Sequence, residues 1–178
     1  QKEFAFDTET ANFNPVTAEL LGISFSWKAG EAYYLEIISK KQKAKSDLFN
    51  YNKIEKADNA WLEKLKPIFE NAKIKKYGHN IKFDIEVMAS LGIKVKGVAA
   101  DSMIASYLLN PGSRQHNLDA GTFSEFNHQK ITKEDLLGKG KDKLAFGQVA
   151  VEKLYNYSCE DADFTNRLVK KLLPELKK

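Results

Sequence analysis

The chain has 178 residues, of which 43% are hydrophobic and 29% are charged, and its formal net charge is +4. This length and apolar content suit one continuous core, so we expect a single globular domain. No apolar run approaches the roughly 18 residues of a membrane span and no signal peptide opens the chain, so we expect no membrane partner. A lone cysteine, Cys159, excludes an internal disulfide and is typical of a reducing compartment.

The mild positive charge suits a polyanionic partner without requiring one. Lysines cluster at residues 40–45, 73–76 and 139–143, and we interpret each cluster as solvated surface. The chain begins with Gln1 and a strand follows almost at once, which indicates a piece of a longer protein.

The stretch from Phe4 to Thr10 predicts a first strand that runs into two acids. Side chains alternate between the faces of a strand, so Asp7 and Glu9 share one face while Thr8 takes the other. Two adjacent carboxylates repel each other, and a divalent cation with oxygen ligands relieves that repulsion. A pair of this kind also occurs by chance at solvated strand ends, so it is weak evidence alone.

Two further strands follow the first. The apolar residues 21, 23, 25 and 27 alternate with small residues, which predicts a strand with one buried face. A turn at residues 28–30 then leads into a hairpin partner at residues 32–38.

The middle of the chain alternates helices and strands. Residues 39–56 predict an exposed loop, and Asp58 or Asn59 can cap a helix through Phe69 that Pro67 kinks. A short strand at residues 74–77 precedes a helix over residues 81–91 that Gly92 ends. Another strand at residues 98–100 precedes a helix capped by Asp101 that ends at Leu109.

Weaker amphipathic patterns cover residues 118–126 and 133–137, and a long helical pattern covers residues 148–173, ended by Pro174. Strands first, and then strands alternating with helices, predict an α/β fold with a mixed sheet flanked by helices.

Two acids fall on helix faces that should be buried. Asp84 lies in the stripe of Ile81, Met88 and Leu91. On the closing helix, Tyr157 and Asp161 lie in the stripe of apolar residues 154, 164, 168 and 172.

A lone buried carboxylate is costly, so each of these two acids needs a partner. Asp84 could pair with a lysine or a backbone amide, and Asp161 could lie on the helix surface. By contrast, Glu160 lies off the stripe and Asp163 has Arg167 four residues on, so we assign both to solvent. Four inward acids from a strand and two helices together predict a binuclear metal cage.

Three motifs carry a family resemblance: Phe6-Asp7-Thr8-Glu9, the run from His79 to Asp84 with its Asn-x-x-x-Asp, and the run from Tyr157 to Asp161 with its Tyr-x-x-x-Asp. They resemble the exonuclease motifs of the DEDD superfamily, tyrosine subclass. The stretch from Asp101 to Asp163 is similar to the 3'-5' proofreading domains of bacterial DNA polymerases I.

The resemblance implies a ribonuclease-H-like fold with a mixed five-stranded sheet, attached to a polymerase in a longer chain. It implies hydrolysis of the 3'-terminal phosphodiester of single-stranded DNA to nucleoside 5'-monophosphates, with two divalent ions (Mg²⁺ or Mn²⁺, with Zn²⁺ as an alternative at one site). Asp7 would bridge both ions, Glu9 and Asp161 would complete one site, and Asp84 would hold the second ion largely through water. The family setting is a monomer in the bacterial cytoplasm or an organelle of bacterial descent.

The resemblance also implies the substrate contacts. Tyr157 would orient the attacking water with Glu9, because a phenol with a pKa near 10 is a poor base at neutral pH. Phe13 would stack on the terminal base, or else belong to the core, and the Thr10 backbone would meet the 3' hydroxyl. Asn80 would contact the strand, cap its helix, or do both. Lys133 departs from the family, which has an aromatic residue there, while Arg114 and Gln115 could meet phosphate.

Two other functions remain open. An RNase D-like or Werner-like exonuclease would act on RNA or structured DNA. A degenerate exonuclease fold kept as a nucleic-acid-binding scaffold would have lost acids, whereas all four are present here.

Overall fold

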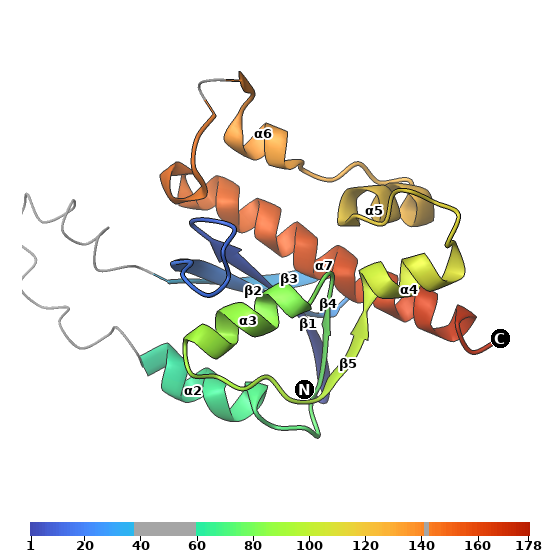
Figure 1. Cartoon of the computed structure of the whole chain (residues 1–178), viewed down its shortest axis with the longest axis horizontal. Coiled ribbons are helices and arrows are strands. Elements are labelled where there is room, and N and C mark those ends of the chain that lie inside the picture. The colour runs from blue at the N-terminus through green and yellow to red at the C-terminus, as the bar shows by residue number, and fades with distance from the viewer. Residues whose placement is uncertain (38–59, 141–142) are drawn as a thin grey trace, which may run out of the picture.

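The computed structural model describes residues 1–37, 60–140 and 143–178. Its centre is a five-stranded sheet with the order β3-β2-β1-β4-β5 (Figure 1). β1 pairs antiparallel with β2 and parallel with β4, so the sheet is mixed, as the sequence predicted. The strands are β1 (Glu3–Thr10), β2 (Leu20–Lys28), β3 (Glu31–Glu36), β4 (Lys75–Gly78) and β5 (Val98–Asp101).

Helices cover both faces of the sheet. The long helix α7 packs on β1 to β4 and also contacts α4, α5 and α6, which gather along it in Figure 1. α2 and α3 cover the opposite face, where Phe69 and Met88 join the core. The helices are α2 (Ala60–Phe69), α3 (Lys82–Ser90), α4 (Ser102–Leu109), α5 (Leu118–Phe126), α6 (Lys133–Leu137), the 3-10 turn η2 (Phe146–Gln148) and α7 (Val151–Glu175). None of the helices in these ranges combines the length and apolar character that crossing a membrane requires.

The alternation of β1 sets the direction in which its two acids point. Phe4 and Phe6 pack with Phe69 on the α2–α3 side, and the Phe6 and Phe69 ring centroids lie 4.9 Å apart. Ala5 packs on the other side, against Val169 of α7. Asp7 and Glu9 follow Ala5 at intervals of two residues, so their carboxylates lie on the same face of β1 and point toward α7.

β2 is buried on both faces, so the prediction of a single buried face is wrong. Ser24 and Ser26 are fully buried, because α7 covers the face that their small side chains form. The Asn166 amide of α7 donates to Ser26 Oγ at 3.2 Å. Small polar residues therefore line a helix contact here and not a solvated surface.

The boundaries of α7 also differ from the prediction. η2 interrupts the pattern at its start, so α7 begins at Val151. Pro174 lies inside the last turn and the helix ends one residue later. A proline removes one hydrogen bond and strains the turn before it, so α7 ends soon after Pro174 but not at it. The predicted helices over residues 102–109, 118–126 and 133–137 are confirmed.

One lysine of the cluster at residues 73–76 is buried, contrary to its assignment to solvent. Lys76 is fully buried, and its Nζ donates to the Asn71 carbonyl at 2.7 Å. Burial lowers the pKa of this amine. The predicted loop at residues 39–56, its lysines and the caps Asp58 and Asn59 lie outside the described residues.

Asp101 caps α4 and also holds the segment that leads into α3. Its Oδ1 accepts from the N–H groups of Met103 and Ile104, which begin α4, as predicted. Its two oxygens also accept from the N–H groups of Asn80 at 3.1 Å and Ile81 at 2.9 Å, which lead into α3. One carboxylate thus ties the end of β5 to the two helices that flank the sheet edge.

We predict that Asp101→Ala lowers the free energy of unfolding by about 2 kcal/mol, because the start of α4 and the segment that leads into α3 both lose their acceptor. Asn117→Ala is the matched control, since Asn117 caps only α5 and should cost about 1 kcal/mol. Urea unfolding of both variants measures the difference. Equal losses would show that the contact with the segment before α3 contributes nothing.

Candidate metal centre

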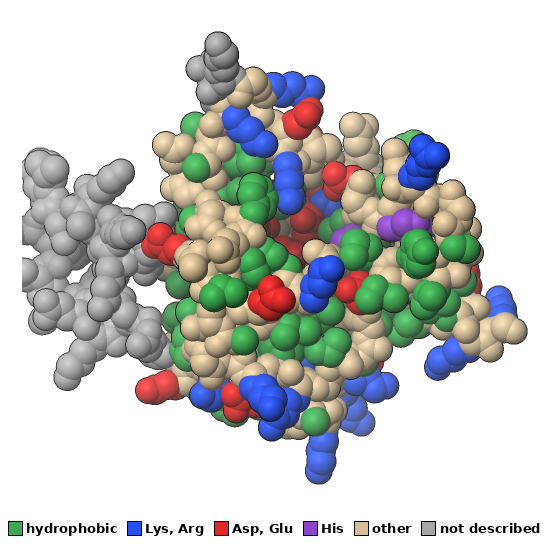
Figure 2. Space-filling model, viewed as in Figure 1, with side chains coloured by type: hydrophobic (Ala, Val, Ile, Leu, Met, Phe, Trp, Pro, Cys, Tyr) green, Lys and Arg blue, Asp and Glu red, His purple; other side chains and the backbone are tan. Residues whose placement is uncertain are grey.

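A cavity of about 710 Å³ opens beside the carboxyl end of β1. Figure 2 shows acidic side chains at the bottom of a hollow on this face of the molecule. Five predicted site residues, which are the four inward acids and the tyrosine, line this cavity: Asp7, Glu9, Asp84, Tyr157 and Asp161. Segments separated by some 150 positions in the chain therefore meet at one site.

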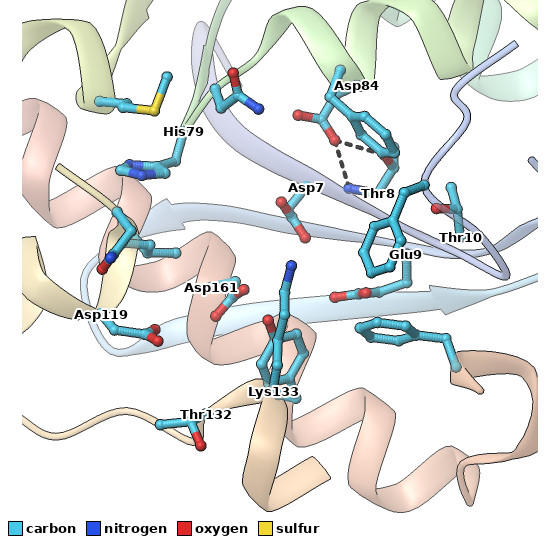
Figure 3. Close-up of a pocket in the computed structure, with 18 of the residues that line it drawn as sticks. Asp7, Thr8, Glu9, Thr10, His79, Asp84, Asp119, Thr132, Lys133 and Asp161 are labelled. Carbon is cyan, nitrogen blue, oxygen red and sulfur yellow. Dashed lines mark hydrogen bonds between the residues drawn. The ribbon is translucent and has the colours of Figure 1, made fainter. Parts of the chain in front are cut away.

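Three of the acids form a compact ligand group. Asp7, Glu9 and Asp161 each offer a carboxylate oxygen, and these oxygens all lie within 4.8 Å of one another. Figure 3 shows the three side chains turned toward one another. Asp7 and Glu9 reach this point from the α7-facing side of β1, and Asp161 from the buried face of α7.

Asp84 lies beside this group but is held differently. It is 3% exposed on α3, and its Oδ1 accepts from the Thr8 N–H at 2.9 Å and from the Thr8 hydroxyl at 2.6 Å. The alternation of β1 explains this contact, because Thr8 points away from Asp7 and Glu9 toward α3. Asp84 therefore has the backbone-amide partner that the sequence analysis left open, and it also lines the cavity.

Burial and mutual repulsion disfavour the charged forms of these acids. Burial, and after it the neighbouring Asp161, raises the pKa of Glu9 to about 8. Burial raises the pKa of Asp84 to about 7 and that of Asp161 to about 6. The pKa of Asp7 is raised well above its usual range, by burial and then by Asp84 and Glu9.

The site fits a hard divalent cation. Among the described residues, the buried Glu9 Oε1 is an acceptor with no hydrogen-bond partner. Two like charges about 5 Å apart cost roughly 3 kcal/mol at an effective dielectric of about 20. Clustered carboxylate oxygens are the ligands that Mg²⁺ and Mn²⁺ prefer, and a bound cation would reverse both penalties.

Lys130 supplies a positive charge that the sequence did not reveal. Its Nζ donates to Asp161 Oδ1 and lies 3.6 Å from Asp119 Oδ1. Burial alone would lower the pKa of this amine, but attraction by Asp161 and then Asp119 leaves it raised. The lysine lies in an irregular segment between α5 and α6, where no periodicity marks a residue as buried.

Tyr157 is a neutral phenol in this setting. It is 5% exposed and lies one turn before Asp161 on α7. Burial, together with the charge of Asp161, raises its pKa above the ordinary value. The residue can therefore donate a hydrogen bond, but it cannot act as a base at neutral pH.

The predicted substrate contacts also line the cavity. Phe13 is 71% exposed, which rules out the alternative that it is a core residue. The Lys133 amine lies 5.5 Å from the Phe13 ring centroid, and Phe146, which the sequence did not suggest, packs edge-on against that ring. Thr10 is buried, and its hydroxyl donates to the Asn12 carbonyl.

Asn80 does not cap α3. The helix begins after Ile81 without a side-chain cap, and Asp101 accepts the N–H groups of Asn80 and Ile81 just before it. Asn80 has the left-handed backbone at φ 59°, a conformation that asparagine tolerates. Arg114 and Gln115 are exposed but are not among the residues that line the cavity.

Asp163 is buried and Glu160 is partly buried, so their assignment to solvent is wrong, although the expected pair between Asp163 and Arg167 is present. Asp163 is 8% exposed and accepts from the Gly30 N–H at 2.8 Å as well as from Arg167, because the β2–β3 turn covers this part of α7. Glu160 accepts from His128 and from the Ile131 N–H. Contacts across the sequence, which helix periodicity does not report, hold both acids.

Comparison with known proteins gives consistent matches over the whole chain. A family model described as a 3'-5' exonuclease matches residues 1–177. The DNA polymerase I of Pseudomonas aeruginosa is 37% identical over 174 residues, which are 97% of this chain and 18% of that polymerase. The chain therefore spans less than a fifth of the length of this relative.

Solved structures share the fold. Brucella melitensis NrnC bound to pGG has a TM-score of 0.68 at 25% identity, with 99% of this chain and 74% of NrnC covered. Trypanosoma brucei RNase D has a TM-score of 0.67 at 12% identity, with 97% and 57% covered. The expected ribonuclease-H-like exonuclease fold is confirmed.

The raised acid pKa values predict an unusual pH dependence for the metal-free protein. Because the acids bind protons more tightly in the folded state, their protonation stabilises it. This stabilisation is fully present below about pH 4 and is lost as the pH rises through about 6 to 8. In EDTA, the free energy of unfolding should be about 2 kcal/mol lower at pH 8.5 than at pH 6.5.

The comparison starts at pH 6.5 because of His79, whose pKa burial lowers to about 4. Below pH 6.5 this histidine is protonated mainly in the unfolded chain, which lowers the stability of the folded state and opposes the effect of the acids. Saturating Mg²⁺ should remove the difference, since a cation stabilises the ionised acids. Urea unfolding at both pH values measures the effect. Equal stability in EDTA would contradict the electrostatic description of the site.

Proposed function

Because this chain belongs to the family of 3'-5' exonuclease domains, we propose that it hydrolyses the 3'-terminal phosphodiester of single-stranded DNA and releases nucleoside 5'-monophosphates. The observation that carries the proposal is the group of three carboxylate oxygens within 4.8 Å, with Asp84 and Tyr157 in the same cavity. We further propose that the domain proofreads for a DNA polymerase I, of which it would be one part. The match to such polymerases over 97% of the chain supports this.

Asp7, Glu9 and Asp161 would hold one divalent ion, and Asp7 and Asp84 would hold a second. The geometry supports different roles for the acids, since one oxygen of Asp84 accepts hydrogen bonds from Thr8 and Asp84 is outside the compact group. Mg²⁺ or Mn²⁺ at these positions would supply an activated water and stabilise the leaving 3' oxygen in an in-line displacement. A histidine base is then unnecessary.

Tyr157 would position the attacking water. Its buried phenol keeps its proton, so its hydroxyl can direct a water molecule but cannot deprotonate it. Glu9 would share this task, because its Oε1 lies buried without a partner within the described part of the chain.

Phe13 would stack on the terminal base at the mouth of the cavity, and Asn80 and the Thr10 backbone would meet the strand and its 3' end. An exposed aromatic ring reads no sequence, and this suits an enzyme that removes any mispaired nucleotide. Lys133 stands beside this ring as a cation that a phosphate could approach.

RNA is the alternative substrate. The structural likeness to T. brucei RNase D is consistent with this alternative. The 37% identity to a DNA polymerase I over nearly the whole chain favours DNA.

We predict that the protein shortens a 5'-labelled DNA oligonucleotide one nucleotide at a time from its 3' end with Mg²⁺ or Mn²⁺, and does so faster than the matched RNA. Asp7→Asn should lower the rate at least about 10³-fold, because it removes a ligand shared by both ions. Glu86→Gln is the control, since Glu86 is an exposed acid of α3. Faster digestion of RNA would overturn the DNA assignment. If neither oligonucleotide is digested, the proposed exonuclease activity is wrong.

Tyr157→Phe should slow cleavage about 10- to 100-fold and leave Mn²⁺ affinity unchanged, because it removes a positioning hydroxyl and no ligand. Single-turnover cleavage and calorimetric Mn²⁺ titration test the two halves of this prediction. A parallel loss of metal affinity would assign the tyrosine to the metal site itself.

A further inference from the structure

Lys130 is a buried lysine inside the acid cluster, and the hydrolysis described above gives it no role. It is 3% exposed, although the residues just before it, 127–129, are exposed. Its Nζ contacts Asp161 Oδ1, lies 3.6 Å from Asp119 Oδ1 and lies 5.2 Å from the Tyr157 ring centroid. A buried ammonium is costly unless it is paired, so these carboxylates hold it in place.

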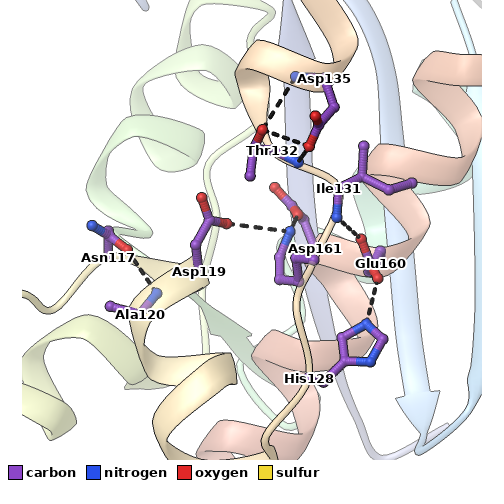
Figure 4. Close-up of polar contacts among 10 residues, drawn as sticks. Asn117, Asp119, Ala120, His128, Ile131, Thr132, Asp135, Glu160 and Asp161 are labelled. Carbon is purple, nitrogen blue, oxygen red and sulfur yellow. Dashed lines mark hydrogen bonds and ion pairs between the residues drawn. The ribbon is translucent and has the colours of Figure 1, made fainter.

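Glu160 fixes the chain on both sides of Lys130 (Figure 4). Its Oε1 accepts from His128 Nε2 and its Oε2 accepts from the Ile131 N–H, both at 2.7 Å. The His128 ring also stacks on Phe164, with centroids 4.6 Å apart. Because Glu160 directly precedes the acid that Lys130 contacts, one turn of α7 both presents the carboxylate and anchors the segment that delivers the lysine.

Asp119 offers the ammonium a second position. It lies at the start of α5 and lines the same cavity, its side chain is 52% exposed, and it is outside the compact ligand group. The Nζ of Lys130 is already within ion-pair distance of both Asp161 and Asp119. A small shift of the lysine would free Asp161 and keep the ammonium paired.

We propose that Lys130 is a resident counter-cation of the metal centre, which neutralises Asp161 until a divalent ion binds and then moves to Asp119. This inference rests on the proposed function, because it takes Asp161 to be a metal ligand. The ammonium lessens repulsion among the acids in the metal-free protein. It also competes with the incoming ion, so it lowers the affinity of the site for metal.

The direct test replaces the charge and keeps the length of the side chain. Lys130→Met should bind Mn²⁺ about tenfold more tightly than the parent chain in calorimetric titration, because a competing cation is gone. It should also have a lower melting temperature in EDTA and gain more from added Mn²⁺. Lys64→Met, at an exposed lysine of α2, should match the parent in both measurements.

Unchanged or weaker Mn²⁺ binding by Lys130→Met would overturn the inference. Lys130→Gln keeps a hydrogen-bond donor without the charge, so it gives the same reading if the methionine variant does not fold. Tighter Mn²⁺ binding by either variant of a chain that cleaves no nucleic acid would support the counter-cation and defeat the proposed function. If the chain cleaves DNA and the Lys130 variants bind Mn²⁺ as the parent does, the counter-cation inference fails and the proposed function stands.

A double-mutant cycle tests the move to Asp119. Asp119→Asn should weaken Mn²⁺ binding severalfold in the parent chain, because Lys130 then has nowhere else to pair. In the Lys130→Met background the same change should have a much smaller effect, since only a distant charge is lost. Equal effects in both backgrounds would show that the lysine does not change partners.

Discussion

The repulsion among buried carboxylates at the end of β1 is the constraint on which the rest of the molecule depends. Side chains alternate along β1, so Asp7 and Glu9 share one face of the strand, and that face packs against α7. There they meet Asp161, with oxygens close enough that three charges cannot persist without a cation. The sheet, the long helix and the surrounding loops hold this unfavourable cluster together.

Several features balance that constraint from outside the cluster. Thr8 takes the opposite face of β1 and orients Asp84 with two hydrogen bonds, so the fourth acid is aligned without crowding the first three. Asp101 fixes the start of α3 and therefore the position of Asp84 along it. Lys130 brings a compensating charge from the loop between α5 and α6. The contacts of these neighbours therefore offset part of the cost of clustering the acids.

Local periodicity was enough to predict the fold class and the acids. Phe4 and Phe6 define one face of β1, so Asp7 and Glu9 had to lie on the other, and the stripe of α7 contained Tyr157. Contacts between segments far apart in the chain were not accessible in this way.

Glu160 and Asp163 were misplaced because the contacts that bury them come from residues 128–131 and from the β2–β3 turn, which no helical wheel reveals. The buried face of Ser24 was missed because serine is usually solvated, whereas here it admits a helix. Lys130 was missed since irregular segments carry no pattern of burial.

The central claim is that the carboxylates of this cavity bind divalent cations, and anomalous diffraction from a crystal soaked in Mn²⁺ tests it most directly. We expect a strong peak among Asp7, Glu9 and Asp161, and a second peak near Asp84 about 3.5–4 Å from the first. A soaked crystal with no peak at these carboxylates, or with peaks only elsewhere on the molecule, would contradict the account.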